Sequence, residues 1–299
     1  MSEAPPKSSK PGEGTPTADQ LEFPLDRSPQ ADRNWDRGGR SFYFFDFDDN
    51  VMHLDTPIFV FERGTGRELR LSTAEFAQVS PMLGQPGPYA RFEIDLDDAT
   101  GSFRRFRDLR GSVDASAQPF VEDLRQALEA PDVRWKGPSW DLFAHAVFNG
   151  RPVSVITARG HEPGILRHGL HQLVEAGWLA QDPNYLTVFP VSYPPIRDAL
   201  AGGEDGLTVA ELKMRAIIDS VGLAMERYGR NPYHRFGMSD DSPENVELAV
   251  AAMTRLKAMY PENAFFVIDT SRRPATMTEI VDGSPQDREM NPDEQLALF

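Results

Sequence analysis

Short apolar segments alternate with amphipathic segments along most of the chain. The first apolar segment, residues 41–45, is nearly all aromatic, and a second, residues 152–157, is rich in β-branched side chains. Segments of this length that are apolar throughout are typical of strands buried on both faces of a parallel sheet. Three further strands are expected at residues 185–191, 234–238 and 264–268, and three helices at residues 161–176, 208–228 and 245–260. Strands that alternate with helices predict an α/β fold, in which helices cover both faces of a parallel central sheet.

A different pattern occupies residues 58–150. Two strand-like segments flank Arg63–Gly66, whose glycines indicate a hairpin. Ser72 and Glu75 have the spacing of a capping box at the start of a short helix. The elements expected here are strands at residues 57–62, 67–72 and 89–96 and helices at residues 119–130 and 139–148. We therefore expect a mixed α+β insertion at residues 58–150, between the two parts of the α/β core at residues 41–57 and 151–270.

The two ends of the chain and residues 103–109 are polar. Residues 1–40 are rich in Pro, Ser, Gly, Asp and Lys, and their few apolar side chains cannot offset the entropy cost of ordering the backbone. We expect a disordered N-terminal tail at residues 1–40 and a flexible C-terminal tail at residues 271–299. Residues 103–109, with the sequence FRRFRDL, are interpreted as a solvated face of a surface element.

The composition excludes several classes of protein. The chain has 299 residues, of which 40% are hydrophobic and 26% are charged, as is usual for a globular protein. No apolar run is long enough to cross a bilayer, and the first residues lack the apolar region of a signal peptide. Since there is no cysteine, a disulfide framework, a thiolate metal site and a cysteine nucleophile are excluded. The net charge of −15 argues against non-specific nucleic-acid binding, although a local basic groove stays possible. We expect a cytoplasmic protein.

Acidic side chains follow the first expected strand at once. Asp46, Asp48 and Asp49 come directly after the aromatic run. Ligands of open parallel α/β sheets bind beyond the carboxyl ends of the strands. Carboxylates crowded there repel each other unless a cation lies among them, and a hard cation such as Mg²⁺ prefers oxygen ligands. Taken alone, the stretch predicts either a metal site or an Asp-rich turn after a strand.

Later strands carry polar residues at the same end. Thr157 ends the second strand, Asp240 and Asp241 follow the fourth, and Lys213 lies on the helix before it. Parallel strands place their carboxyl ends at one edge of the sheet, so these side chains can converge. Singly, a threonine at a strand end is usually a turn residue, a helical lysine is usually solvated, and an Asp-Asp-Ser-Pro run usually caps a helix. The occurrence of all of them in this order along the chain favours a functional site at the edge of the sheet.

The four segments resemble the motifs of the haloacid dehalogenase (HAD) superfamily of phosphohydrolases. Asp46-Phe47-Asp48-Asp49-Asn50 is similar to the first motif, DxDx[TV], with Asn50 in place of Thr or Val and Asp49 where Gly is common. Thr157, Lys213 and Ser239–Glu244 resemble the second, third and fourth motifs. The resemblance covers residues from about 40 to 56 and from 151 to 271. It implies a HAD-like, Rossmann-like three-layer sandwich with residues 58–150 in the position of a cap domain.

The resemblance also implies a Mg²⁺-dependent phosphatase that forms an aspartyl-phosphate. Asp46 would be the nucleophile, and Asp48 would protonate the leaving oxygen and then activate water. Thr157 and Lys213 would hold the phosphoryl oxygens. The metal ligands would be Asp46, the Asp48 backbone carbonyl and either Asp240 or Asp241.

Three points stay open at this level. The spacing pairs Asp240 with Glu244 and Asp241 with Asn245, which favours Asp240 as the ligand. The weaker candidates for the site are His53, His161 and Arg159, the last as a bidentate donor to a substrate phosphate. The substrate is a phosphorylated molecule of unknown identity, and the alternative to an enzyme is a non-catalytic adaptor with a HAD fold.

Residues 295–299 form a second short sequence motif. Gln295, Leu296, Leu298 and Phe299 match the pattern Gln-Leu-x-Leu-Phe, which resembles the bacterial sliding-clamp-binding peptide. A flexible tail with two apolar anchors and an amide suits a preformed groove on a partner. The resemblance implies a sliding clamp as a partner and makes a nucleotide or nucleic-acid-end phosphate a plausible substrate; the alternative is an incidental hydrophobic end.

Overall fold

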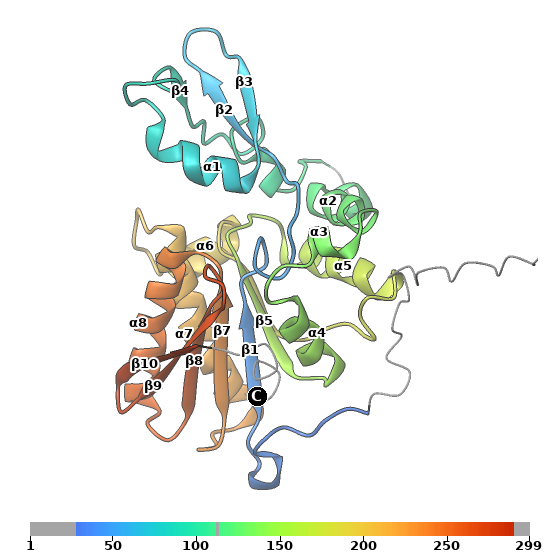
Figure 1. The fold of residues 1–299 in the computed structure, drawn as a ribbon, viewed down its shortest axis with the longest axis vertical. Coiled ribbons are helices and arrows are strands. Elements are labelled where there is room, and N and C mark those ends of the chain that lie inside the picture. The colour runs from blue at the N-terminus through green and yellow to red at the C-terminus, as the bar shows by residue number, and fades with distance from the viewer. Residues whose placement is uncertain (1–27, 112–113, 290–299) are drawn as a thin grey trace, which may run out of the picture. The chain divides into compact units, whose positions relative to one another are not determined.

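A seven-stranded sheet with the strand order β10-β9-β8-β7-β1-β5-β6 is the centre of the fold (Figure 1). The computed structural model describes residues 28–111 and 114–289. Strand β1 pairs in parallel with β5 and β7, and β6 and β8 extend the sheet in parallel on either side. The bounds of these strands are β1 Ser41–Phe45, β5 Pro152–Thr157, β6 Asn184–Pro190, β7 Arg235–Asp240 and β8 Ala264–Asp269. The predicted parallel central sheet is confirmed for these strands.

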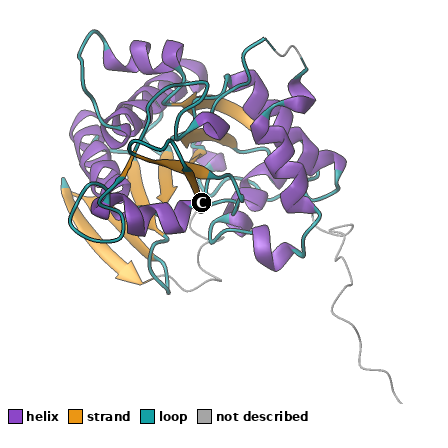
Figure 2. Ribbon diagram, turned by 90° about the horizontal axis from the view of Figure 1, so that it is seen from above, coloured by secondary structure: helices purple, strands orange, loops and turns teal. Residues whose placement is uncertain are grey.

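Helices cover both faces of this sheet, and Figure 2 shows them on either side of the strands. One apolar cluster joins α2, α3, α4 and α5 to one face, and a second joins α6, α7 and α8 to the other. The bounds are α2 Pro119–Leu128, α3 Asp132–Trp135, α4 Trp140–Phe148, α5 Pro163–Glu175, α6 Pro194–Ala201, α7 Val209–Tyr228 and α8 Pro243–Met259. The predicted α/β fold with flanking helices is thus confirmed.

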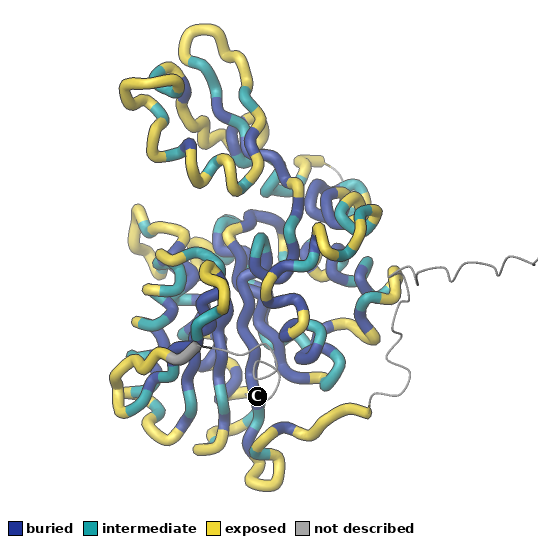
Figure 3. Tube along the Cα trace, in the orientation of Figure 1, coloured by how far each residue is buried: buried dark blue, intermediate teal, exposed yellow. Residues whose placement is uncertain are grey.

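Strand β1 is apolar throughout because both of its faces are covered. Phe42 and Phe44 belong to the cluster beneath α7 and α8, and Tyr43 and Phe45 belong to the cluster beneath α4. Each of these four side chains is at most 1% exposed, and Figure 3 shows the central strands buried along their length. The first acidic residue, Asp46, therefore comes where the strand leaves the core.

The predicted insertion contains a small antiparallel sheet with the strand order β3-β2-β4. Its strands are β2 Ile58–Glu62, β3 Glu68–Leu71 and β4 Phe92–Glu93, the last much shorter than the expected strand at residues 89–96. Helix α1, Thr73–Val79, begins with the predicted capping box, in which Ser72 and Glu75 bond each other's backbone. Val60, Leu71, Val79 and Phe92 form a separate apolar cluster, so this part has a core of its own.

The rest of residues 58–150 packs differently. Side chains of α2, α3 and α4, among them Phe120, Trp135 and Phe143, belong to the main apolar cluster with β1 and β5. The short 3₁₀ segments are η1 Trp35–Arg37, η2 Ser80–Met82, η3 Arg104–Phe106 and η4 Ala115–Ala117. Part of the range predicted as an insertion therefore covers the central sheet itself.

The prediction of polar tails needs correction at both ends. Residues 276–281 and 284–289, placed in a flexible tail from 271 to 299, form β9 Thr276–Val281 and β10 Ser284–Glu289. Strand β9 extends the sheet antiparallel to β8, and β10 pairs antiparallel with β9. Within the predicted disordered tail at residues 1–40, Asp32 is buried and pairs with Arg151 at 3.0 Å. Burial of this ion pair fixes the segment that leads into β1.

Two predictions fall on residues outside the described ones: disorder of residues 1–27, and clamp binding by Gln295–Phe299. Both stay predictions. Among the described residues, no helix has both the length and the apolar character that a membrane crossing needs.

Candidate functional site

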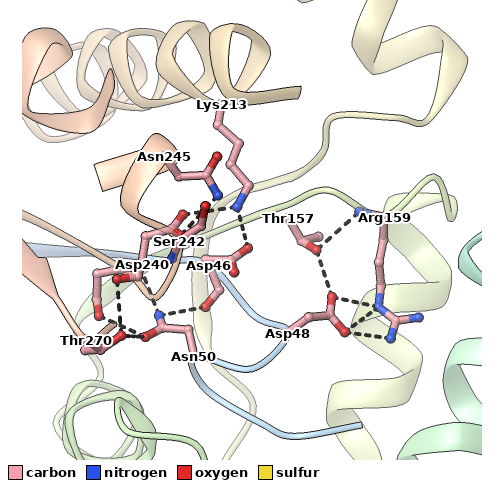
Figure 4. Close-up of polar contacts among 11 residues, drawn as sticks. Asp46, Asp48, Asn50, Thr157, Arg159, Lys213, Asp240, Ser242, Asn245 and Thr270 are labelled. Atoms are coloured by element: carbon pink, nitrogen blue, oxygen red, sulfur yellow. Dashed lines mark hydrogen bonds and ion pairs between the residues drawn. The ribbon is translucent and has the colours of Figure 1, made fainter. Parts of the chain in front are cut away.

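Ends of the central strands carry the predicted site residues: Asp46 and Asp48 after β1, Thr157 at the end of β5, and Asp240 at the end of β7. Figure 4 shows that the side chains form two groups. We call Asp46, Asp240, Asp241 and Lys213 the lysine group, and Asp48, Thr157 and Arg159 the arginine group. The topology therefore brings together residues from four distant segments, as the sequence predicted.

In the lysine group, a buried ammonium bridges two carboxylates. Helix α7 carries Lys213 to the edge of the sheet, where Nζ donates to Asp46 Oδ1 at 2.8 Å and to Asp240 Oδ2 at 3.0 Å. The Lys213 side chain is 4% exposed. A buried charge of this kind persists because nearby carboxylates compensate for its lost hydration.

The charges of the lysine group do not balance, because three carboxylates face one ammonium. Burial raises the pKa of Asp46 well above its usual range, and Asp240 and Asp241 add to this while Lys213 opposes it. Burial and the Asp240 carboxylate raise the pKa of Asp241 to about 6. Burial disfavours the charged form of Lys213, but Asp240 and Asp46 outweigh that effect and raise its pKa. The group therefore favours additional positive charge.

The three carboxylates of the lysine group fit a hard divalent cation. One oxygen each from Asp46, Asp240 and Asp241 lies within 4.8 Å of the others. Carboxylate oxygens are the ligands that Mg²⁺ and Ca²⁺ take in proteins. Both alternatives for the metal ligand, Asp240 and Asp241, belong to this cluster, whereas among the described residues the Asp48 carboxylate does not. The predicted ligand atom of Asp48 is its backbone carbonyl, so that part stays a prediction.

Asp240 is held in a fixed orientation by its second oxygen. Oδ1 accepts from the Ser242 amide at 2.9 Å and from Asn245 Nδ2 at 3.1 Å. The spacing in the sequence pairs Asp240 with Glu244, but in the structure Glu244 is exposed and Asn245 makes the contact. Helix α8 begins directly after this turn, so its first residues support the Asp240 carboxylate.

In the arginine group, Asp48 is bound through both of its oxygens. Arg159 Nε donates to Oδ2 at 2.9 Å, Arg159 Nη2 donates to Oδ1 at 2.7 Å, and Thr157 Oγ1 donates to Oδ2 at 3.2 Å. Arg159 is fully buried, and the Asp48 side chain is 19% exposed. The guanidinium that the sequence analysis considered for a substrate phosphate is thus bidentate to a carboxylate of the chain itself.

Asn50 joins the ends of three strands. Its Nδ2 donates to the backbone oxygens of Asp46, at 3.1 Å, and Ser239, at 2.9 Å. Its Oδ1 accepts from the hydroxyls of Ser139 and Thr270, both at 2.8 Å, and of Ser239 at 3.2 Å. Because Asn50 is fully buried and both ends of its amide are bonded, it fixes the turn that follows the strand.

The other residues considered for the site occupy different places. His161 is fully buried, with Nδ1 2.8 Å from Asp108 Oδ1 and Nε2 3.4 Å from Arg159 Nη1. Burial lowers the pKa of His161, so at neutral pH Nδ1 donates to Asp108 and Nε2 accepts from Arg159. His53 lies 3.2 Å from Asp49, whose φ of 61° is a left-handed conformation that Asp tolerates and Gly adopts freely.

The basic residues 103–109 are ion-paired. Each arginine is half-buried against an acidic partner, and the pairs are Arg104 with Glu68, Arg105 with Asp123 and Arg107 with Asp98. The interpretation as a solvated face is therefore wrong for these arginines, because acids of the insertion compensate their charge. They are not free to bind an anion without breaking these pairs.

Comparison of the chain with family models, with curated proteins and with solved structures finds no match. The site therefore rests on its own geometry. Sequence reasoning missed the Asn50 hydrogen bonds and the Arg159–Asp48 pair. The only signals were an asparagine within the acidic turn and an arginine two residues after Thr157.

Proposed function

We propose that this protein is a Mg²⁺-dependent phosphatase of the HAD type that acts through an aspartyl-phosphate. The observation that carries the proposal is the lysine group, in which one buried ammonium lies between the expected nucleophile, Asp46, and the expected metal ligand, Asp240. The strand order β8-β7-β1-β5-β6, with the acidic residues at the carboxyl ends of β1 and β7, also supports it.

The first step of the proposed reaction transfers the phosphoryl group to the protein. A carboxylate oxygen of Asp46 attacks phosphorus, and the bond between phosphorus and the leaving oxygen breaks. Asp48 enters this step protonated, so a proton taken from solvent replaces one of the bonds that its carboxylate accepts from Arg159. It gives this proton to the leaving oxygen, which departs as an alcohol. The Lys213 ammonium and the Thr157 hydroxyl donate to the non-bridging phosphoryl oxygens, after giving up their present contacts with carboxylates.

The second step returns the protein to its starting state. Asp48, now ionised, takes a proton from water as the water oxygen attacks phosphorus. The bond between phosphorus and Asp46 breaks, which releases inorganic phosphate and restores the Asp46 carboxylate. Asp48 is again protonated, so protons balance over the two steps.

Asp46, Asp240 and Asp241 would hold Mg²⁺. When bound, the ion supplies the positive charge that the three carboxylates lack, which lowers the pKa of Asp46 and offsets its repulsion of an anionic phosphate. Lys213 alone supplies one charge for three acids, so the proposal requires metal-dependent activity.

Hydrolysis of p-nitrophenyl phosphate tests this function. We expect release of p-nitrophenol with Mg²⁺, little with EDTA, and a loss of at least ~10⁴-fold for Asp46→Asn because the nucleophile is gone. Acid quenching should trap phosphate on the unmodified protein in a hydroxylamine-sensitive form, as expected of an acyl phosphate. An Asp46→Asn variant with unchanged activity would exclude the assigned nucleophile.

The substrate and the alternative function need a wider screen. Phosphorylated metabolites and oligonucleotides with 3′- or 5′-phosphates would identify the leaving group. If no phosphate ester is hydrolysed, the alternative gains support, namely a non-catalytic adaptor with the same fold.

We also propose a sliding clamp as a partner, on the basis of the terminal sequence Gln295–Phe299. Removal of these five residues should abolish binding to a purified bacterial clamp while phosphatase activity stays unchanged. Binding that persists in the shortened protein, or that is absent from the full chain, would exclude the peptide as the attachment point.

A further inference from the structure

Arg159 is a charged side chain with no exposed surface. Its guanidinium carbon lies 4.8 Å from the ring centroids of both Phe106 and Phe120. Besides its contacts with Asp48, Nη2 donates to Thr56 Oγ1 at 2.8 Å. Aromatic faces and hydrogen bonds to several groups compensate for the lost hydration of the guanidinium and fix its plane.

Both rings come from residues between the first two strands of the core, and close packing holds them. The Gly160 amide donates to the Phe106 carbonyl at 2.8 Å, and a Cβ at Gly160 would lie 2.8 Å from Arg107 Nη1. Phe120, on α2, lies against Gly169 of α5, where a Cβ would be 2.4 Å from the ring. Glycine at position 169 therefore allows the close approach of the Phe120 ring, and the Gly160 amide fixes the backbone of Phe106.

A chain of polar contacts leads from the guanidinium into α2. Thr56 Oγ1 accepts from Arg159 and donates to Asp123 Oδ2 at 2.8 Å. Asp123 is buried, and its Oδ1 accepts from Arg105 Nη2 at 2.5 Å. Each buried group in this chain has a partner, so the orientation of Arg159 depends on side chains of α2 and of the segment before it.

We propose that Arg159 is a positioning residue for Asp48, and that Phe106, Phe120 and Asp123 set the acid–base step by holding this arginine. The inference rests on the proposed function, since Asp48 requires exact placement only if it transfers protons. Two parallel N–H donors fix the plane of a carboxylate, which a single ammonium does not. Misplacement by ~1 Å can cost a reaction ~10²-fold.

A leaving-group comparison distinguishes a positioning role from general damage. p-Nitrophenol leaves readily without a proton, so a misplaced Asp48 mainly slows the second step, and the phosphorylated protein accumulates. An alkyl alcohol needs the proton, so with an alkyl phosphate the first step slows and no such species accumulates. Damage to the whole site would slow both substrates without this difference.

The variants are Arg159→Lys, Asp48→Asn as the reference, and Arg104→Lys as the matched control. Arg104 bonds Glu68 and stacks on Phe59, away from Asp48. For Arg159→Lys we expect kcat on an alkyl phosphate to fall ~10²-fold with KM within about threefold. With p-nitrophenyl phosphate, acid quenching should trap more phosphorylated protein, as for Asp48→Asn. Arg104→Lys should behave like the unmodified protein.

Other outcomes separate the two proposals. A raised KM with unchanged kcat would show that Arg159 binds substrate, and unchanged kinetics would show that it has no role; each overturns the inference and leaves the phosphatase intact. If the unmodified protein hydrolyses no phosphate ester, the proposed function fails and this inference with it.

A second arm tests the contribution of α2 and does not depend on folding of the Arg159 variant. Asp123→Asn and Phe120→Leu leave Asp48 and Arg159 in place but loosen the guanidinium. Both should lower kcat on the alkyl phosphate about 5- to 20-fold, a smaller loss than for Arg159→Lys, with the same accumulation on p-nitrophenyl phosphate. Combined with Asp48→Asn, neither should lower kcat further, since the positioned group is absent. Additive losses would overturn the inference.

Discussion

Asp46 and Asp48 lie two residues apart, yet their surroundings differ in charge. Asp46 belongs to the lysine group, in which three carboxylates surround one ammonium. Asp48 belongs to the arginine group, in which one carboxylate faces one guanidinium. One group has an excess of negative charge, and the other is balanced.

This difference indicates how one strand end can support two kinds of chemistry. Under the proposed function, the unbalanced group would hold a cation, and an anionic phosphate would follow it. The balanced group needs neither a cation nor an anion. Its geometry fixes the plane of the Asp48 carboxylate, because two N–H groups of the buried Arg159 guanidinium donate to it. The comparison predicts that changes in the lysine group depend strongly on Mg²⁺, whereas changes elsewhere do not.

The largest effect on stability is expected for Lys213→Met. Without the ammonium, three partly or fully buried carboxylates face each other unpaired, and loss of one partner of a buried ion pair costs about 3–5 kcal/mol. Mg²⁺ should recover most of this loss, because it binds the folded state and supplies the missing charge. Urea unfolding in EDTA measures the loss of stability, and urea unfolding in Mg²⁺ measures how much of it the ion recovers.

Lys257→Met is the matched control, because Lys257 donates to the Asn263 carbonyl at 2.8 Å, outside the two groups. The loss of unfolding free energy in Lys257→Met should be smaller than in Lys213→Met, and it should be the same with Mg²⁺ and with EDTA. If Lys213→Met were as stable as the unmodified protein in EDTA, the carboxylates would not carry the charge assigned to them.

The fold was predictable where one local pattern dominated. Residues 41–45 and 152–157 were correct to the residue as strands, because both faces of these strands are buried and every position is constrained. The hairpin β9–β10 was missed because β9 mixes polar with apolar residues and β10, at the sheet edge, consists almost entirely of polar residues. Its turn, Asp282-Gly283, has positive φ at both residues, and this dipeptide is a strong hairpin signal.

The candidate site was predictable only in its outline. Asp46, Thr157, Lys213 and Asp240 could be placed at one edge, because parallel strands have a common direction. The Arg159–Asp48 pair and the Asn50 hydrogen bonds could not, since they depend on how the turn after β1 folds against β5, β7 and β8. Such contacts join residues more than a hundred positions apart, and no local pattern encodes them.

A smaller effect is expected for Asn50→Ala, which probes the neutral connection between the strand ends. The variant removes both ends of a fully buried amide, so the Asp46 and Ser239 carbonyls and three hydroxyls each lose one hydrogen bond, at a cost of about 2–3 kcal/mol. Because no charge is lost, the cost measured by urea unfolding should be similar with Mg²⁺ and with EDTA. In the control Asn184→Ala, which removes one exposed bond to the Gly150 carbonyl, the cost should stay below about 1 kcal/mol. Equal losses in the two variants would contradict a structural role for Asn50.

The smallest effect is the contribution of Asp241 to the pH dependence of stability, measured in EDTA. Its pKa is about 6 in the folded protein and near 3.8 when exposed, so the folded state binds the proton more tightly. The contribution of Asp241 to the free energy of unfolding therefore falls as pH rises from about 4 to about 6. Asp241→Asn removes this penalty and should be more stable than the unmodified protein above pH 6 by about 1–3 kcal/mol, with part of the shift screened by solvent. Near pH 4 the two should be equal.

Urea unfolding from pH 4 to pH 8 measures this difference, with Glu244→Gln as the control on an exposed acid of the same segment. Mg²⁺ should reverse the order above pH 6, because the variant loses a ligand while the unmodified protein gains stability from the bound ion. The gain in unfolding free energy of Asp241→Asn could instead be the same at pH 4 and pH 8, or persist in Mg²⁺. Either result would mean that repulsion among the three carboxylates is not its cause. The charge difference between the two groups would then lose its physical basis.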